Sequence, residues 1–240
     1  GFCLVGSEMC IRDRNTIFAL NAADTGAGAV YVASGSAPEF LNCVFWANAH
    51  LGGNGEAGAM YVTDESSARI VNCTVTRNTT TQNYSAIFVH PNATATTLIA
   101  NSIVWDNQEN AGKTPLGLGP MSVEYSNTAP VETGPGNISA DPGFVDAVNG
   151  VVELTAGSPS IDAANSCAYD GPYFDASWSQ GRFVDDPGVA NTGSGDLPQL
   201  DMGAFEFACV ASTCPGDIDG NGIVDVSDLL ALLGSWGVCP

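Results

Sequence analysis

A repeat of about 30 residues constrains the fold of this chain more than any other feature of its sequence. Residues 29–48 align with residues 59–78 at an offset of 30, and a third copy, residues 86–107, follows at an offset of 27 to 29. Each copy contains two short β-rich runs separated by a polar turn. A period of this length with strand patterns and no helical pattern excludes helical repeats and predicts a solenoid of parallel strands.

Asparagine recurs at two positions of the repeat, at the turn between the runs and again six residues later. The two sets are Asn42, Asn72 and Asn101, and then Asn48, Asn78 and Asn107. Asparagine tolerates the left-handed backbone conformation that a sharp corner requires. Stacked side-chain amides can also hydrogen-bond from one coil to the next. We therefore expect two Asn ladders along the solenoid.

Apolar and small residues also recur, and they predict which side chains face the interior. Around the turn, the expected interior stacks are Phe40, Ile70 and Ile99, then Cys43, Cys73 and Ser102, and then Phe45, Val75 and Val104. In the other run they are Val30, Met60 and Ile87 with Val32, Val62 and Val89, which places Tyr31, Tyr61 and Phe88 outside. The two-residue period of a strand leaves the opposite phase open. We expect Cys43 and Cys73 to be stacked thiols, because their side chains leave adjacent parallel coils in the same direction.

The charge balance excludes several kinds of partner. Six basic residues stand against 26 acidic ones, which gives a formal net charge of −20. Nucleic acid and anionic membrane surfaces are therefore not expected partners, and cations are the natural counter-species. No apolar run approaches the roughly 20 residues that cross a bilayer, so the sequence shows no transmembrane segment.

Residues 1–14 do not fit the repeat, and they resemble a translated sequencing-adapter read. We set them aside as an artefact, together with Cys3 and Cys10, and expect the solenoid body to occupy residues 15–207. The alternative is a genuine N-terminal strand, because the spacing from Cys10 to Asn15 matches that from Cys73 to Asn78.

Three motifs in the second half of the chain carry a family resemblance. They are NISADPGFVD (137–146), LTAGSPSIDAA (154–164) and DMGAFEF (201–207). Together with the repeats, they resemble bacterial extracellular proteins with a right-handed parallel β-helix, in the pectate-lyase-like superfamily. The resemblance covers residues 28–207 and implies an all-β, right-handed parallel β-helix at an extracellular or cell-surface location. It also implies a C-terminal cap that closes the open end of the solenoid, with Asp141, Ser158, Asp162, Asp201 and Glu206 in its turns.

The motif DIDGNGIVDVSD (217–228) has oxygen ligands at the spacing of a 12-residue calcium loop. The expected Ca²⁺ ligands are Asp217, Asp219, Asn221, the Ile223 carbonyl, Asp225 through water, and Asp228. Gly222 occupies the sharp turn at the sixth position, and apolar residues follow at helical spacing. The alternative is an acidic turn before an amphipathic helix, but that would not require an oxygen donor at every ligand position.

Residues 208–240 resemble a dockerin repeat, the calcium loop and helix that bacterial extracellular proteins use for attachment. The resemblance implies a cohesin-like or other surface anchoring partner. Asp228 at the last ligand position is similar to dockerins, but only one unit is visible where dockerins have two. Cys214 and Cys239 bracket the unit and would close it in an oxidising compartment.

Catalysis by this chain is not the expected function, although enzymes occur among pectate-lyase-like β-helices. A lyase needs a basic residue and a cation-bridged uronate, yet few basic residues are present and a charge of −20 repels polyuronates. A hydrolase needs two carboxylates as acid and base. Asp185 and Asp186 are the obvious pair, and a turn in the cap is the simpler interpretation. The alternative to a non-catalytic protein is a fragment of a polysaccharide lyase or glycoside hydrolase whose active-site coils lie elsewhere.

Carbohydrate binding is compatible with the composition, because sugars stack on exposed aromatic faces and a neutral glycan is indifferent to net charge. Two rows of aromatic residues recur at outward positions: Trp46 and Trp105 with Thr76 between them, and Tyr31, Tyr61 and Phe88. The alternatives are that these rows pack beneath loops, or that the protein is a structural rod that presents loops. We therefore expect a surface protein for presentation or polysaccharide binding.

Overall fold

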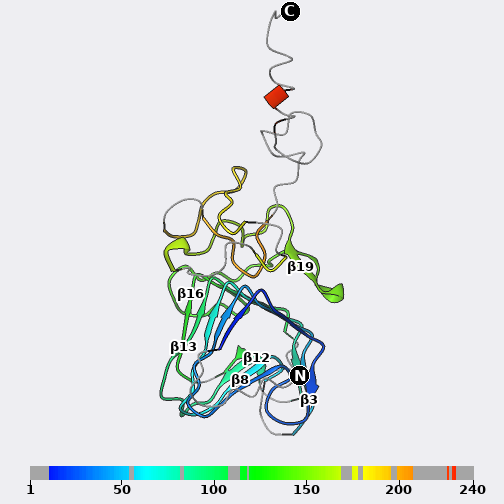
Figure 1. Cartoon of the computed structure of the whole chain (residues 1–240), viewed down its shortest axis with the longest axis vertical. Coiled ribbons are helices and arrows are strands. Elements are labelled where there is room, and N and C mark those ends of the chain that lie inside the picture. Colours follow the sequence, from blue (N-terminus) through cyan, green and yellow to red (C-terminus); the bar gives the residue numbers. More distant parts are fainter. Residues whose placement is uncertain are drawn as a thin grey trace, which may run out of the picture.

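The computed structural model describes a parallel β-solenoid and a segment that packs beside it (Figure 1). The described residues are 11–53, 57–81, 84–107, 114–117, 119–168, 175–177, 181–195, 199–207, 226 and 229–230. No helix in this part of the chain is long and apolar enough to cross a membrane.

Four parallel sheets form the sides of the solenoid. Sheet A contains β1 (Arg12–Arg14), β5 (Glu39–Leu41), β9 (Arg69–Val71), β13 (Thr97–Ala100) and β16 (Met121–Glu124). Sheet B contains β2 (Ile17–Ala19), β6 (Val44–Trp46), β10 (Thr74–Thr76), β14 (Ile103–Trp105) and β17 (Asn127–Thr128). The short sheet C contains β3 (Ala22–Ala23), β7 (Ala49–His50) and β11 (Thr79–Thr80). Sheet D contains β4 (Val30–Val32), β8 (Met60–Val62), β12 (Tyr84–Val89) and β15 (Thr114–Leu116).

The strand register reproduces the sequence repeat. Val44 of β6 pairs with Thr74 of β10, 30 residues later, and Thr74 pairs in turn with Ile103 of β14. In sheet D, Met60 of β8 pairs with Ile87 of β12. Among the described residues, the chain passes through sheets A, B, C and D in the first three coils, whereas the fourth coil shows strands of sheets A, B and D. The prediction of an all-β parallel solenoid is confirmed.

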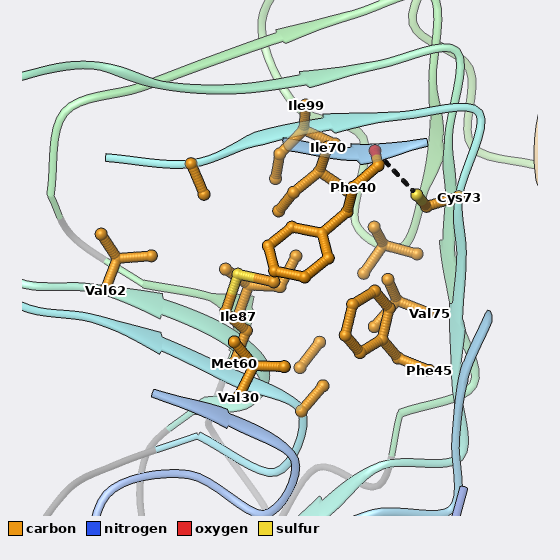
Figure 2. Close-up of a cluster of buried hydrophobic side chains, with 14 of the residues drawn as sticks. Val30, Phe40, Phe45, Met60, Val62, Ile70, Cys73, Val75, Ile87 and Ile99 are labelled. Carbon is orange, nitrogen blue, oxygen red and sulfur yellow. Dashed lines mark hydrogen bonds between the residues drawn. The ribbon is translucent and has the colours of Figure 1, made fainter. Parts of the chain in front are cut away.

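The prediction of which strand residues face the interior is also confirmed. Phe40, Ile70 and Ile99 stack beside Phe45, Val75, Met60 and Ile87 in one apolar core (Figure 2). Cys43 and Cys73 lie in this core as free, buried thiols, as predicted. The Cys73 thiol donates to the Phe40 carbonyl at 3.4 Å (Figure 2), and burial raises its pKa.

The second Asn ladder forms a continuous chain of amide hydrogen bonds through the buried corner between sheets B and C. Asn21 donates to Asn48 at 2.8 Å, Asn48 donates to Asn78 at 2.9 Å, and Asn78 donates to Asn107 at 2.9 Å. These amides also satisfy buried backbone groups, since Asn78 donates to the Phe45 carbonyl at 2.9 Å. The ladder includes Asn21, one coil earlier than the three repeats predict.

The two Asn positions use different backbone conformations. At the corner between sheets A and B, which we call the Asn corner, the asparagine itself is left-handed, with φ between 49° and 53° at Asn15, Asn42, Asn72 and Asn101. At the second ladder, the left-handed residue is the one before the asparagine: Leu20, Ala47, Arg77 and Asp106. There the asparagine amide makes the hydrogen bond between coils, and the preceding residue adopts the left-handed conformation that turns the chain.

Residues of the segment that the sequence analysis sets aside lie within the first coil. Arg12–Arg14 form β1 and pair in parallel with β5, and the Asn42 amide donates to Asn15 at 3.2 Å. Asn15 is therefore equivalent to Asn42, not to Asn78 as the cysteine spacing suggests. This placement is what a genuine N-terminal strand would show, while residues 1–10 lie outside the described residues. The artefact stays a prediction.

The described residues between 138 and 207, which we call the C-terminal segment, pack on the outer face of sheet B. The segment includes the antiparallel pair β18 (Phe144–Asp146) and β19 (Val151–Leu154), and the short helices η1 (Ala147–Asn149) and η2 (Ser166–Ala168). Its apolar side chains form two clusters with residues of β6 and β14. The family resemblance implies a cap over the end of the solenoid, whereas these residues cover a side of it (Figure 1). The reason is that sheet B also has an apolar outer face.

Candidate functional site

An aromatic column lies on the outer face of sheet D. Tyr31, Tyr61 and Phe88 occupy equivalent positions of β4, β8 and β12. The Tyr31 and Tyr61 ring centroids are 5.3 Å apart at an interplanar angle of 74°. Tyr61 and Phe88 are stacked, with centroids 5.0 Å apart. The predicted outward row is therefore a contiguous surface feature.

Sequence analysis missed a fourth member of this column, Tyr84. Its ring stacks on Phe88 with centroids 4.6 Å apart and planes at 3°. Tyr84 and Phe88 are four residues apart on β12, but Ala86 between them is buried and the strand register shifts in this stretch. A strict two-residue period therefore does not identify Tyr84. Beyond Phe88 lies His90, whose Nδ1 is 3.7 Å from an Asp64 carboxylate oxygen.

Glycines fit the column closely at two points. A Cβ on Gly26 would lie 2.9 Å from the Tyr31 ring, and one on Gly117 would lie 2.4 Å from the Phe88 ring. The backbone therefore packs against these two rings and limits their rotamers. Tyr31 remains 36% exposed, and Tyr61, Phe88 and Tyr84 are partly exposed. The column is a rigid, partly apolar surface with phenolic hydroxyls at its margin.

The tryptophan row lies beneath the C-terminal segment. Trp46, Thr76 and Trp105 are in register on sheet B, as predicted. The Trp46 Nε1–H donates to the Ala147 carbonyl at 2.7 Å, and Trp105 packs against a cluster that includes Leu154. These contacts correspond to the packing alternative that the sequence left open for this row. Sheet D therefore offers the more accessible aromatic surface.

A cluster of charged residues, which we call the acidic cluster, holds the C-terminal segment together. It contains the buried residues Asp162, Asp175, Asp201, Glu206 and Arg182 and the partly exposed Asp186. Arg182 is completely buried, its Nη1 lies 3.4 Å from Glu206, and its Nη2 donates to the Asp201 carbonyl at 2.8 Å. Sequence analysis assigned four of these carboxylates, Asp162, Asp186, Asp201 and Glu206, to turns but did not predict that they form a cluster with Arg182. These carboxylates do not recur at a regular spacing, so the sequence contains no simple signal for the cluster.

Burial dominates the protonation of this cluster. It raises the pKa of Asp162 to about 7, with a further contribution from the negative charge of Asp201. It raises the pKa of Asp201 to about 6, although two backbone N–H groups and Arg182 oppose the shift. Burial also raises the pKa of Glu206 against the attraction of Arg182. These carboxyl groups therefore hold protons more strongly than ordinary ones.

The carboxylates do not form an evident metal site. Among the described residues, no group of three or more His, Cys, Asp or Glu side chains is arranged to hold a metal ion. Of the pair considered for hydrolysis, Asp186 accepts the Gly188 N–H at 2.9 Å in a turn.

The predicted calcium ligands all lie outside the described residues, as do Cys214 and Cys239. Of the helix expected after the loop, Val226, Leu229 and Leu230 are described, and they are helical and exposed.

Comparison with protein families decides the classification of the solenoid. A model described as the right handed beta helix region matches residues 1–124, half of the chain. The chain belongs to the right-handed β-helix family. Comparison with curated proteins found no match, and comparison with solved structures found none either. In this β-helix, the matched residues include the whole aromatic column, while the acidic cluster lies beyond them.

Proposed function

We propose that this β-helix protein is a non-catalytic surface protein that binds neutral polysaccharide through the aromatic column of sheet D. The observation that supports the proposal is the contiguous stack of Tyr31, Tyr61, Phe88 and Tyr84 rings on one accessible face. Sugar rings present flat faces of C–H groups, and these bury apolar area against aromatic rings while hydroxyls remain in water. Because the column is built on sheet strands, little conformational entropy is lost on binding.

The net charge of −20 selects among glycans. Asp64 and His90 lie at one end of the column, and the acidic excess of the chain repels uronates and sulfated sugars. A neutral glycan meets no such repulsion. We therefore propose neutral polysaccharides as the ligand class and an extracellular or cell-surface location as the setting.

Affinity electrophoresis in gels that contain neutral or acidic polysaccharides tests this function. Wild type is expected to be retarded by at least one neutral polysaccharide, and Tyr61→Ala should weaken binding about tenfold, equivalent to about 1.4 kcal/mol. Phe183→Ala is the matched control, because Phe183 is an exposed aromatic residue outside the column. Equal retardation of wild type and Tyr61→Ala in every gel would contradict the proposal and favour a structural rod.

We further propose that the tail binds Ca²⁺ and anchors the protein to a cohesin-like or other surface partner. The ligand spacing of residues 217–228 supports the metal, and the exposed helical residues Val226, Leu229 and Leu230 support a partner-binding helix. Calorimetric titration of the whole chain with Ca²⁺ should show binding that Asp217→Ala abolishes and Asp141→Ala preserves. Absence of heat at millimolar Ca²⁺ would contradict the metal site.

A further inference from the structure

The C-terminal segment is fastened to the Asn corner by hydrogen bonds from single side chains. The Asn72 amide donates to the Asp201 carbonyl at 2.9 Å, and the Asn15 amide donates to the Asp175 carbonyl at 2.8 Å. Asn101 makes two bonds with Asn165, accepting its N–H at 2.8 Å and donating to its carbonyl at 3.0 Å. The corner that turns the solenoid is therefore also the surface on which the segment docks.

Two of the residues docked at this corner, Asp175 and Asp201, are members of the acidic cluster. The Asp201 carboxylate accepts the Asp162 N–H at 2.8 Å and the Phe207 N–H at 2.5 Å. The Asp175 carboxylate accepts the Glu206 N–H at 3.2 Å. These bonds set the path of the chain through the docked residues. The protonation of the cluster is therefore coupled mechanically to docking.

Asp162 is a buried member of the cluster whose hydrogen bonding is incomplete. It is fully buried, one carboxylate oxygen accepts the Asp186 N–H at 3.2 Å, and the other oxygen, Oδ1, has no hydrogen-bond partner. The charged groups that act on Asp162 and Asp201 are Asp185, Asp186, Glu206 and Arg182. Within the described residues, one guanidinium therefore faces several carboxylates, and full ionisation would leave buried negative charge uncompensated.

We propose that Asp162 and Asp201 act as a proton-dependent clamp, which holds the C-terminal segment on the Asn corner while these carboxyls are protonated and loosens it when they ionise. The direction follows from linkage: both groups have a higher pKa in the folded segment than the ordinary value of about 4, so they stabilise docking fully below that value. This contribution is lost as pH rises through about 6 for Asp201 and about 7 for Asp162. A rise in pH from about 5 to above 7 would therefore loosen the cover over the tryptophan row.

Hydrogen exchange measured by mass spectrometry on the whole chain tests the clamp, with rates corrected for the intrinsic pH dependence of exchange. The reporting peptides contain Asn165, Gly203 and Ala204, whose N–H groups bond to Asn101 and Thr74 across the interface. Their protection should fall at least about tenfold between pH 5 and pH 8, the equivalent of one pKa unit. Peptides from β9 and β10 should keep their protection.

Asp162→Asn is the decisive variant, because a neutral amide imitates the protonated carboxyl. Asn also suits the left-handed backbone of this residue, whose φ is 50°. The variant should retain more protection at pH 8 than wild type, whereas Asp141→Asn, an exposed control in the same segment, should behave as wild type. A pH-independent wild type, parallel loss in the solenoid peptides, or an Asp162→Asn curve equal to that of wild type would each overturn the proposal. If the variant does not fold, the pH dependence of protection in the wild-type protein still tests the proposal.

Discussion

The solenoid and the C-terminal segment bury their side chains in two different ways. The solenoid repeats one solution: apolar side chains stack on their own equivalents, and Asn78 pairs with Asn48 and Asn107. The segment has no repeat, and it buries Arg182 among carboxylates that occur at irregular spacing.

This difference determines how each region responds to change. In a solenoid, the free energy of unfolding is approximately the sum of the stabilities of the coils and of the interfaces between neighbouring coils, so many apolar contacts contribute to it. In the segment, several bonds depend on the charge state of a few groups, so it should respond to pH and to single substitutions in a way that the coils do not. Three substitutions test the contrast.

The largest effect is expected from truncation in the solenoid core. Phe45 is buried between Phe18, at a centroid distance of 4.7 Å, and Phe40, at 5.6 Å. Phe45→Ala should lower the free energy of unfolding by about 3–5 kcal/mol, because it removes buried area and leaves a cavity. Urea denaturation measures the change. Ile17→Ala, on the next strand but 60% exposed, is the control and should change stability by less than about 0.5 kcal/mol.

A local effect of somewhat smaller size is expected from Arg182→Met. The substitution removes the buried positive charge 3.4 Å from Glu206, which should cost about 3 kcal/mol in the segment. The cost should be greater at pH 8 than at pH 5, because Asp201, whose pKa is about 6 and which Arg182 attracts, is ionised at pH 8 and then needs the counter-charge. Limited proteolysis should then cleave the segment while the solenoid survives. Simultaneous cleavage of both regions would show that they form one cooperative unit.

The smallest of the three effects is expected from the second ladder. Asn78→Ala removes the acceptor for the Asn48 N–H at 3.0 Å and the donor to the Phe45 carbonyl at 2.9 Å, both buried. Leaving these groups unpaired should cost about 2 kcal/mol at every pH, since amides do not titrate. Thermal unfolding measures the loss, with Asn92→Ala in an exposed turn as the control. A strongly pH-dependent loss would contradict the contrast between the two regions.

Much of the fold followed from the repeat, because each coil must match its neighbours. The interior phase, the outward aromatic row and both Asn ladders were predicted from the positions of residues such as Phe40, Tyr61 and Asn72, and they are confirmed. The candidate site was predicted only in part: the column was found without Tyr84, and the accessible row could not be distinguished from the covered one. The calcium loop remains a prediction from ligand spacing.

The sequence by itself determined the solenoid, the faces of its strands and the turns at Asn42, Asn72 and Asn101, because local backbone preference and a constant period act on every coil alike. Only the tertiary structure decided what covers each face. Trp46 and Tyr31 both recur on outer faces, yet the Trp46 indole donates to Ala147 of the C-terminal segment, whereas Tyr31 remains exposed. The convergence of Asp201 and Glu206 on Arg182 was equally invisible, because contacts between irregular segments depend on the path of the whole chain and have no period that a sequence can display.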